Sequence, residues 1–404
     1  MGRVVRVGGV RGPAGNLALL VAVFIVWLLV GGALSDAETT SALRVEVSGA
    51  PQSVRGSDRR EHVEYDLIVT NAFTADARLT SLEVRGRRRR LLSLSGAALA
   101  AVTLRAGTSA PTDGRVPPAS TVVTQVDLAL PRSVGRTVPV FLTNRIKYAL
   151  PANAPARPVI ATTTVKMSAL RVDPRPPVVI AAPLRGTGWL NANGCCNDPT
   201  SPHRQTLLAT SSGGYDTPET FAIDWIRIVN GRQHNGDGSR NTEWPTYGSP
   251  LFAVADGTVV FARNNRPDIP PRSSNPDLRT PVDFGGNTVI LKIAPGRYAC
   301  YAHMKPGSVR VRPGQRVRVG QRIGLIGNSG NTDGPHLHFG IQRQPFCLST
   351  SEPFEIDRYT LQGMAGPASG PSGIDLVGPR RRELRSYPLI RSVATFQPPL
   401  RSRQ

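Results

Sequence analysis

The sequence has 404 residues, enough for two or three domains of ordinary size, and its 40% hydrophobic content is compatible with globular cores. Its 40 glycines, 36 prolines and 6% aromatic residues favour turn-rich β structure and argue against long helices. The net charge of +21 favours polyanionic partners. No zinc-finger spacing or RNA-binding signature singles out nucleic acid, so we do not expect nucleic acid as a partner.

An apolar segment lies near the N-terminus. Residues 17–34 contain no charged side chain, and they follow a basic stretch that holds Arg3, Arg6 and Arg11. This pattern is typical of a signal peptide or of a single membrane anchor, and its length lies at the border between the two. We assign residues 1–36 to one of these and predict that the rest of the chain is exported, either secreted or membrane-anchored, in the cell envelope.

Short strands are predicted over residues 43–150, because segments with alternating or β-branched residues recur there between turn residues. Strands at this spacing favour an immunoglobulin-like β-sandwich. His62 is the one histidine of the region, and we expect it to be structural or exposed. The predicted strands are Leu43–Val47, Glu64–Val69, Thr80–Val84, Thr121–Leu130 and Val138–Leu142.

Proline-rich stretches predict a linker over residues 151–184, followed by a second β-rich domain over residues 185–360. Residues 361–404 are rich in Gly, Pro, Ser and Arg, and we expect a flexible tail there. The predicted strands of the second domain are Phe252–Phe261, Asn287–Ile293, Tyr298–His303 and Arg322–Ile326.

Four cysteines lie in this second domain: Cys195, Cys196, Cys300 and Cys347. An even number in an exported chain permits disulfides, and each of the two adjacent cysteines could pair with one of the others. The sequence does not decide the pairing. No C-x-x-C pair is present, which argues against a structural zinc–thiolate site.

Two histidines alternate in the segment Gly334–Phe339. In a strand, His336 and His338 would face one side, while Leu337 and Phe339 would enter a core on the other. Two imidazoles would then project together from a rigid element, as a metal site needs. The alternative is two surface histidines that are neighbours by chance.

Two other predicted strands also carry polar groups. Alternation puts Tyr301 and His303 on one face, where His303 could orient a substrate carbonyl or a metal-bound water; a purely structural histidine is the alternative. Asp224 faces away from Phe221 and Ile223, and a carboxylate in an apolar strand is costly unless it is paired or metal-bound. A structural ion pair is the alternative for Asp224.

Taken together, residues 185–360 resemble the lysostaphin/LytM-type zinc endopeptidases. The resemblance implies a LytM-like antiparallel β-sheet core with a groove over the histidine face. The fold class is therefore mostly β, with an immunoglobulin-like β-sandwich followed by this core domain. The segments that carry the resemblance are Ala255–Val259, Gly286–Ile290, Tyr301–Met304, Gly320–Gly324, Gly327–Gly330 and Gly334–Gly340.

The resemblance also implies a cofactor, Zn²⁺, which the family holds with two histidines and one aspartate while two further histidines assist. His338 matches a zinc ligand, and Asp224 matches the aspartate ligand. His336 matches the histidine that acts as general base or positions the water. His303 matches the histidine that stabilises the developing oxyanion.

One zinc ligand of the family has no counterpart in its usual place. The family's first motif, His-x-x-x-Asp, would put a histidine where this chain has Thr220, and a catalytic zinc normally needs three protein ligands. If a hairpin is centred on residues 213–214, His203 lies opposite Asp224 with Cβ atoms about 5 Å apart. We therefore predict His203 as the third ligand, with His234 in reserve.

The resemblance implies a zinc metalloendopeptidase that hydrolyses peptide bonds of peptidoglycan. Thr220 leaves open a degenerate, non-catalytic domain that binds wall peptide or activates a partner hydrolase. A lipoyl-like or phosphocarrier barrel is a third interpretation, disfavoured because Lys305 does not lie at the required hairpin tip. The net positive charge also leads us to expect anionic wall polymers or the outer membrane surface as partners. The oligomeric state is not indicated.

Overall fold

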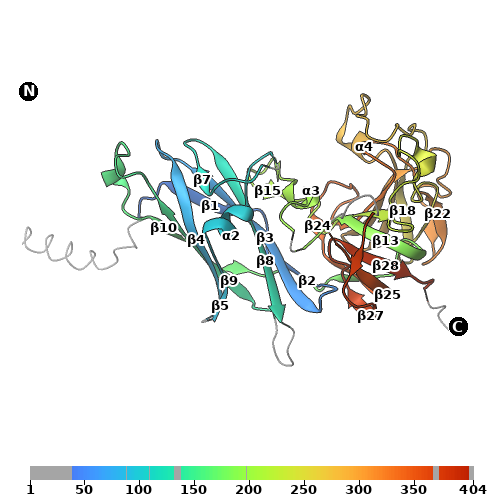
Figure 1. The fold of residues 1–404 in the computed structure, drawn as a ribbon, viewed down its shortest axis with the longest axis horizontal. Coiled ribbons are helices and arrows are strands. Elements are labelled where there is room, and N and C mark those ends of the chain that lie inside the picture. The colour runs from blue at the N-terminus through green and yellow to red at the C-terminus, as the bar shows by residue number, and fades with distance from the viewer. Residues whose placement is uncertain are drawn as a thin grey trace, which may run out of the picture.

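The computed structural model describes residues 39–87, 89–108, 110–131, 138–196, 198–366 and 373–399. Over these ranges the chain is mostly β and largely antiparallel, which confirms the predicted class, and it forms two domains side by side (Figure 1). The predicted signal peptide or anchor at residues 1–36 lies outside the described residues. No helix in the described part is long and apolar enough to cross a membrane.

The N-terminal domain consists of two stacked sheets. Its elements are β1 (Leu43–Val47), β2 (Gln52–Arg55), β3 (Arg60–Asn71), β4 (Ala77–Gly86), β5 (Arg89–Ser95), α2 (Gly96–Ala101), β6 (Thr103–Arg105), β7 (Arg115–Val116), β8 (Thr121–Pro131), β9 (Phe141–Ala149), a 3₁₀ turn (Arg157–Val159), β10 (Thr164–Lys166) and β11 (Leu170–Arg171). One sheet has the order β1-β3-β8-β6 with β2 beside β3, and the other has the order β10-β9-β4-β5 with β7 and β11 at its sides.

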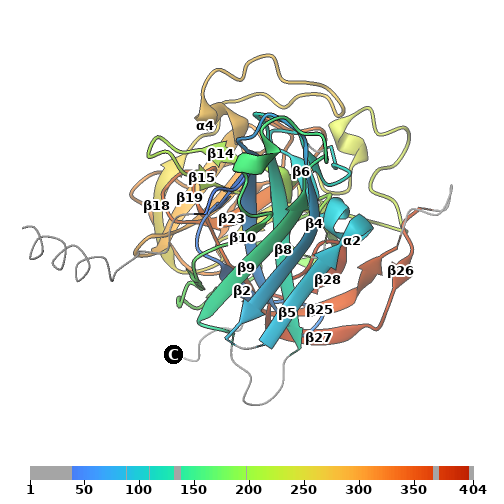
Figure 2. The same ribbon diagram turned by 90° about the vertical axis from the view of Figure 1, so that its left-hand side faces the viewer.

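The two sheets lie one against the other (Figure 2). Side chains from both sheets form one core, which makes this domain a sandwich. Val63 and Leu67 of β3 and Leu82 and Val84 of β4 are fully buried in it. The immunoglobulin-like arrangement of the strands stays a prediction. His62 faces away from this core and is nevertheless buried.

The C-terminal domain is built on one large sheet with the order β12-β25-β28-β13-β16-β23-β20-β19-β18-β21. The elements are β12 (Val178–Ile180), β13 (Gly186–Asn193), α3 (Pro202–Gln205), β14 (Leu208–Ala209), β15 (Tyr215–Asp216), β16 (Ile223–Arg227), a 3₁₀ turn (Asn241–Glu243), β17 (Pro250–Phe252), β18 (Gly257–Ala262), α4 (Pro281–Phe284), β19 (Asn287–Ala294), β20 (Arg297–Met304), β21 (Arg316–Val317), β22 (Arg322–Leu325), β23 (Leu337–Gln342), β24 (Ser351–Glu352), β25 (Phe354–Ala365), β26 (Leu376–Val377), β27 (Arg381–Ser386) and β28 (Ser392–Phe396). Its core contains the fully buried rings of Trp189, Trp225, Tyr301, Phe339 and Phe396.

The C-terminal segment differs from the flexible tail predicted for residues 361–404. β28 lies between β25 and β13 in the large sheet, and β27 pairs with β25. Val393, Ala394 and Phe396 are buried. The overall composition of this segment does not reveal the short apolar strand that it contains. The partner strands lie far away in the sequence, so no local pattern predicts the pairing.

The predicted linker over residues 151–184 also forms strands. β10 and β11 pair with β9 in the sandwich, whereas β12 pairs with β25 in the large sheet. The segment therefore belongs partly to each domain. The prolines that suggested a linker lie between these short strands and limit their length.

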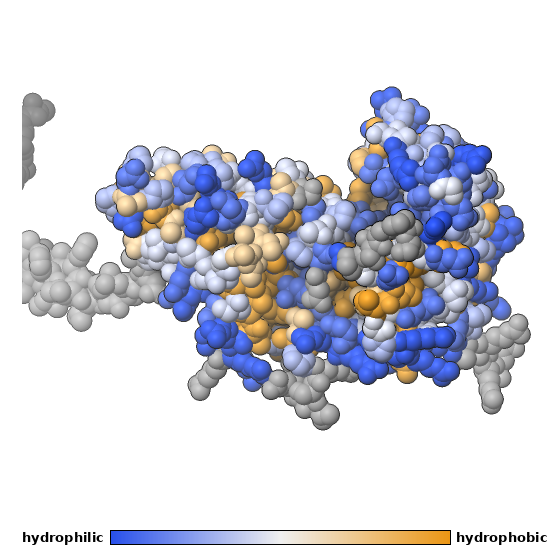
Figure 3. All heavy atoms as spheres, viewed as in Figure 1, coloured by the Kyte–Doolittle hydropathy of each residue, from blue (hydrophilic) through white to orange (hydrophobic). Residues whose placement is uncertain are grey.

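The two domains share a packed interface at β2 and the turn between β2 and β3. Val54 of β2 is buried in the core of the C-terminal domain, and the hydroxyls of Ser57 and Ser392 lie 3.1 Å apart. Arg381 donates a hydrogen bond to the carbonyl of Ser57. On the face seen in Figure 3, hydrophilic residues cover most of the C-terminal domain, in keeping with the net charge of the chain.

Two disulfides are present, and neither is among the pairings considered from the sequence, in which each of the adjacent cysteines pairs with one of the other two. Cys195 is bonded to its neighbour Cys196, and Cys300 is bonded to Cys347 across 47 positions of sequence. The second disulfide joins β20 to the loop that follows β23. It therefore fixes that loop beside the face of the sheet that carries the histidines.

Candidate metal centre

Asp224 and His338 lie directly opposite each other where β16 pairs with β23. His338 Nδ1 is 2.9 Å from Asp224 Oδ1. Both residues reach the same face because their neighbours in the strands, Trp225 and Phe339 among them, are buried in the core on the other face. The alternation predicted from the sequence is therefore observed in both strands.

His203 reaches this pair from α3 and not from a strand. Its Nε2 lies 3.1 Å from Asp224 Oδ2, and its Nδ1 donates a hydrogen bond to the carbonyl of Ala222 over 3.0 Å. The hairpin that suggested this neighbour exists, but its register differs, because Leu208 pairs with Asp216. The predicted proximity is thus found, whereas the predicted strand-to-strand route to it is wrong.

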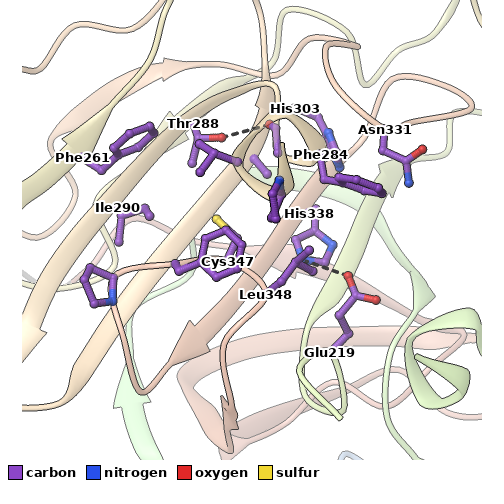
Figure 4. Close-up of a pocket in the computed structure, with 16 residues that line it drawn as sticks. Glu219, Phe261, Phe284, Thr288, Ile290, His303, Asn331, His338, Cys347 and Leu348 are labelled. Atoms are coloured by element: carbon purple, nitrogen blue, oxygen red, sulfur yellow. Dashed lines mark hydrogen bonds and ion pairs between the residues drawn. The ribbon is translucent and has the colours of Figure 1, made fainter. Parts of the chain in front are cut away.

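The three residues form a buried group whose potential ligand atoms all lie within 4.8 Å of one another. Since Nδ1 of His203 carries the proton given to Ala222, its Nε2 is free to bind a metal. His338 Nε2 is buried without a hydrogen-bond partner. A metal bound at His338 Nδ1 would leave the ring proton on Nε2. That nitrogen lies 3.9 Å from the Glu219 carboxylate (Figure 4). Two imidazoles and one carboxylate are a donor set that suits catalytic zinc, so the residues fit this metal.

The reserve ligand does not join this group. The ring of His234 lies against Trp244 with 5.2 Å between the centroids, and its Nε2 lies 3.2 Å from Arg272 Nη2. Another group of potential ligand atoms in the described residues is His62, Glu64 and Cys196. Cys196 is disulfide-bonded and offers no thiolate there.

Two more histidines lie beside the group formed by His203, Asp224 and His338. His336 donates from Nδ1 to the carbonyl of Gly334 over 2.8 Å, and its Nε2 lies 3.4 Å from Asp224 Oδ1. His303 donates from Nδ1 to the carbonyl of Ser329 over 2.8 Å. The centroids of the two rings are 4.6 Å apart. In each ring Nδ1 is therefore bonded to a backbone carbonyl, and Nε2 is the nitrogen that can exchange a proton or contact a substrate.

Tyr301 and His303 do not share a face, contrary to the prediction. Tyr301 packs on Phe339 in the core, and its hydroxyl donates to the carbonyl of Phe252. His303 has a φ of 57°, and the register of β19 with β20 shifts just before it. This bulge turns the side chain to the opposite face, where its ring lies 5.9 Å from that of His338.

Thr220 lies outside the metal group. Its hydroxyl donates to the carbonyl of Thr217 over 3.0 Å, and Arg204 Nη1 donates to it over 3.4 Å. The residue is buried. The position that carries a ligand in the lysostaphin/LytM-type enzymes is thus a structural hydroxyl here.

The electrostatics of the centre follow from burial and from the close charges. Burial alone would raise the pKa of Asp224, but the charges of His203 and His336 hold it well below its usual value. Burial lowers the pKa of His203, and the Asp224 charge outweighs this and raises it to about 9. Burial and the charges of His336 and His338 place the pKa of His303 well below its usual value. Asp224 is therefore an anion that attracts cations.

A groove opens beside His303 and His338 (Figure 4). Its walls are mainly apolar: Phe261, Phe284 and Ile290 line it, and so does the loop after β23, which includes Cys347. Glu219 and Asn331 add polar groups. The groove therefore combines apolar walls with the imidazoles of His303 and His338.

Comparisons with known proteins find similarity over part of the C-terminal domain. A profile described as "Peptidase family M23" matches residues 242–348. The cell division protein DipM of Caulobacter vibrioides is 27% identical over 38% of this chain and 22% of its own length. The peptidoglycan DD-endopeptidase ShyA of Vibrio cholerae is 34% identical over 23% of this chain and 17% of its own length. The matched part is therefore about a fifth of each of these relatives.

Among solved structures, the catalytic domain of lysostaphin from Staphylococcus simulans is 23% identical, with a TM-score of 0.22, and the match covers 36% of this chain and 80% of that one. The M23 metalloprotease pseudoalterin is 16% identical, with a TM-score of 0.26, over 53% and 98% of the two chains. The profile match alone assigns residues 242–348 to a peptidase family M23 domain. His203 and Asp224 precede the matched residues.

Proposed function

We propose that this M23 domain is a zinc-dependent endopeptidase that hydrolyses peptide bonds of peptidoglycan. The observation that carries the proposal is the convergence of His203, Asp224 and His338, whose potential ligand atoms lie within 4.8 Å. The substrate is inferred from relatives such as ShyA, which is named a peptidoglycan DD-endopeptidase. The apolar groove beside the centre suits a peptide segment.

The three ligands would be His203 through Nε2, Asp224 through its carboxylate and His338 through Nδ1. Zinc bound there supplies a Lewis acid that polarises a carbonyl and activates water. Asp224 keeps its negative charge in this buried place because imidazoles surround it on several sides. The negative charge of Asp224 would therefore balance part of the charge of a divalent cation bound there.

We assign the proton transfers to the two remaining histidines. When the His336 ring is neutral, its Nε2 receives the proton of the attacking water, since Nδ1 carries the proton donated to Gly334. His303 stabilises the developing oxyanion. Because its Nδ1 donates to Ser329, His303 offers a hydrogen bond from Nε2 only when the ring holds a second proton, which its lowered pKa opposes until the negative charge of the oxyanion develops beside it.

The test uses the full chain, the zinc content of the purified protein and the release of soluble peptide from isolated peptidoglycan. We expect about one zinc per chain, loss of peptide release with a chelator, and recovery when zinc is added back. A chain that binds zinc but releases no peptide rejects the proposed substrate. A chain that takes up no zinc rejects the metal centre itself.

Thr220 supports a second candidate, a non-catalytic domain that binds wall peptide or activates a partner hydrolase. This candidate predicts sedimentation of the chain with peptidoglycan, no peptide release at any zinc concentration, and the same binding after His338→Ala. The peptidase proposal predicts that His338→Ala abolishes peptide release.

We further propose that the chain acts on the exported side of the cytoplasmic membrane. Two disulfides favour an oxidising compartment, and the apolar segment at residues 17–34 precedes the described domains. The positive net charge favours residence near anionic wall polymers or an anionic membrane surface.

A further inference from the structure

The residue that follows His203 is buried in the interface with the N-terminal sandwich. Arg204 is only 4% exposed. Its Nη2 lies 3.0 Å from Asp66 Oδ1 and 3.1 Å from Glu64 Oε2, and both of these residues belong to β3 of the sandwich. Its carbonyl accepts a hydrogen bond from Gln125 Nε2 over 2.7 Å. Both the guanidinium group and the backbone carbonyl of Arg204 are therefore bonded to the sandwich domain.

These sandwich residues form one patch because of strand alternation. Val63, Tyr65 and Leu67 of β3 point into the sandwich core, so Glu64 and Asp66 point to the outer face. On the paired strand β8, Gln125 lies opposite Asp66. In an isolated sandwich this face would be in water, whereas here α3 covers it, between the two domains (Figure 1).

Burying such groups is costly unless each charge is matched. Burial and the nearby Asp127 raise the pKa of Glu64 well above its usual value. Burial raises the pKa of Asp66 as well, but Asp66 is in direct hydrogen-bond contact with Arg204, and its charge is the largest of those that hold the pKa of Arg204 up against burial. Asp66 is therefore the main counter-charge of Arg204. Removing one charge alone would leave its partner buried and unpaired.

α3 has only four residues, and its C-cap Thr206 is already extended. So short a helix has little stability of its own. His203 and Arg204 are adjacent in it, and Arg204 also donates to Thr220, where the lysostaphin/LytM-type motif has its histidine. The contacts of Arg204 with the sandwich therefore constrain where His203 can lie.

We propose that the N-terminal sandwich is a working part of the metal centre: Glu64, Asp66 and Gln125 hold Arg204 and thereby position His203 as a ligand. Arg204 is a positioning residue and does not touch substrate or metal. This inference rests on the proposed function, and it adds that metal affinity depends on a domain outside the peptidase match. Loss of the sandwich contacts should weaken metal binding without removing any ligand.

The test compares zinc affinity in the full chain, measured by competition with a chromophoric chelator. The main variant combines Arg204→Met, Glu64→Gln and Asp66→Asn, which removes the ion pairs without leaving a buried charge alone. We expect zinc to bind about 10–100-fold more weakly, the range typical for groups that orient a ligand. Peptide release should return towards the wild-type rate at saturating zinc.

Two further variants make the result specific. Ser57→Ala removes a buried polar contact from the same domain interface, away from α3, and should leave zinc affinity unchanged. Arg204→Lys keeps the charge beside Asp66 and should retain more affinity than the triple variant. Thermal unfolding of each variant separates misfolding from a specific effect.

Equal zinc affinity in the wild-type chain and the folded triple variant overturns the inference and leaves the peptidase proposal intact. Equal weakening in Ser57→Ala and in the triple variant also overturns it, because any damage to the interface would then have the same effect. A wild-type chain that binds no zinc overturns the proposed function, and this inference falls with it.

Discussion

Asn193 donates a hydrogen bond from Nδ2 to Asp224 Oδ2 over 2.8 Å, from the strand on the other side of β16. Asp224 is therefore held from both neighbouring strands, by Asn193 on β13 and by His338 on β23. Such a contact fixes the rotation of the carboxylate, so that one oxygen faces His203 and the other faces His338. A group that orients a ligand in this way is expected to contribute to metal affinity.

Asn193→Ala should therefore weaken zinc binding by about 10–100-fold, because Asp224 loses the contact that orients it. Chelator competition measures the change. Asn193→Asp is a useful companion, since it adds a negative charge beside Asp224 and removes the donor. Unchanged affinity in the alanine variant would show that His338 and the strand backbone suffice to hold Asp224.

His203→Ala should cost more zinc affinity than the about 10–100-fold expected for an outer contact, because it removes a ligand. His234→Ala is the matched control, since His234 packs on Trp244 outside the group. Metal analysis after dialysis measures both variants. Full zinc content in a folded His203→Ala chain would contradict the ligand assignment.

His336→Ala should lower kcat/KM for peptide release by about 10²–10⁴-fold, the usual contribution of a general base, with zinc content unchanged. His303→Ala should lower it by about 10²–10³-fold, as expected for loss of one group that stabilises an oxyanion. The measurement compares the initial rate of peptide release with the zinc content of each variant. If either variant loses its zinc as well, that histidine has a ligand role that the assignment does not include.

His62 should make stability depend on pH. Burial would lower its pKa, but hydrogen bonds with Asp127 and Asp58 outweigh this and raise it to about 10. The unfolded value is about 6.5, so this contribution is fully present below pH 6.5 and is lost as the pH rises towards 10. The free energy of unfolding of the wild-type chain, relative to His62→Gln, should fall by at most about 1.4 kcal/mol per pH unit in that window. Parallel curves for the two proteins would refute the prediction.

Replacing Cys300 and Cys347 by alanine should lower the free energy of unfolding by about 4 kcal/mol, because the disulfide closes a loop of 47 positions. Replacing Cys195 and Cys196 by alanine is the comparison, since a bond between neighbours closes almost no loop. Urea unfolding under oxidising conditions measures both. A larger loss from the second pair would show that packing, and not loop closure, sets the effect.

Much of the candidate centre could be predicted from local sequence. Alternation in short apolar segments predicted that His338 and Asp224 leave the core while Phe339 and Ile223 enter it, and the structure shows this. The same rule failed for His303, because a bulge and a positive φ reverse its direction. No pattern of apolar residues signals such a bulge.

Long-range pairing explains the other differences. His203 was expected opposite Asp224 from a hairpin register, yet α3 brings it there, and Arg204 had no signal in the sequence at all. Its partners Glu64 and Asp66 lie more than a hundred positions earlier and read as ordinary polar residues of a strand. β28 was missed for the same reason, since its neighbours β13 and β25 are separate in sequence and composition alone favoured a tail.

The place of β28 has a consequence for the timing of assembly. Residues 392–396 fill the gap between β25 and β13, and β13 carries Asn193 against the metal-site carboxylate. Until these residues have been synthesised, β13 and β25 each have an edge without its partner strand. The support for the carboxylate is therefore completed only after residues 392–396 have left the ribosome, so chains whose synthesis has not yet reached these residues should lack the finished centre.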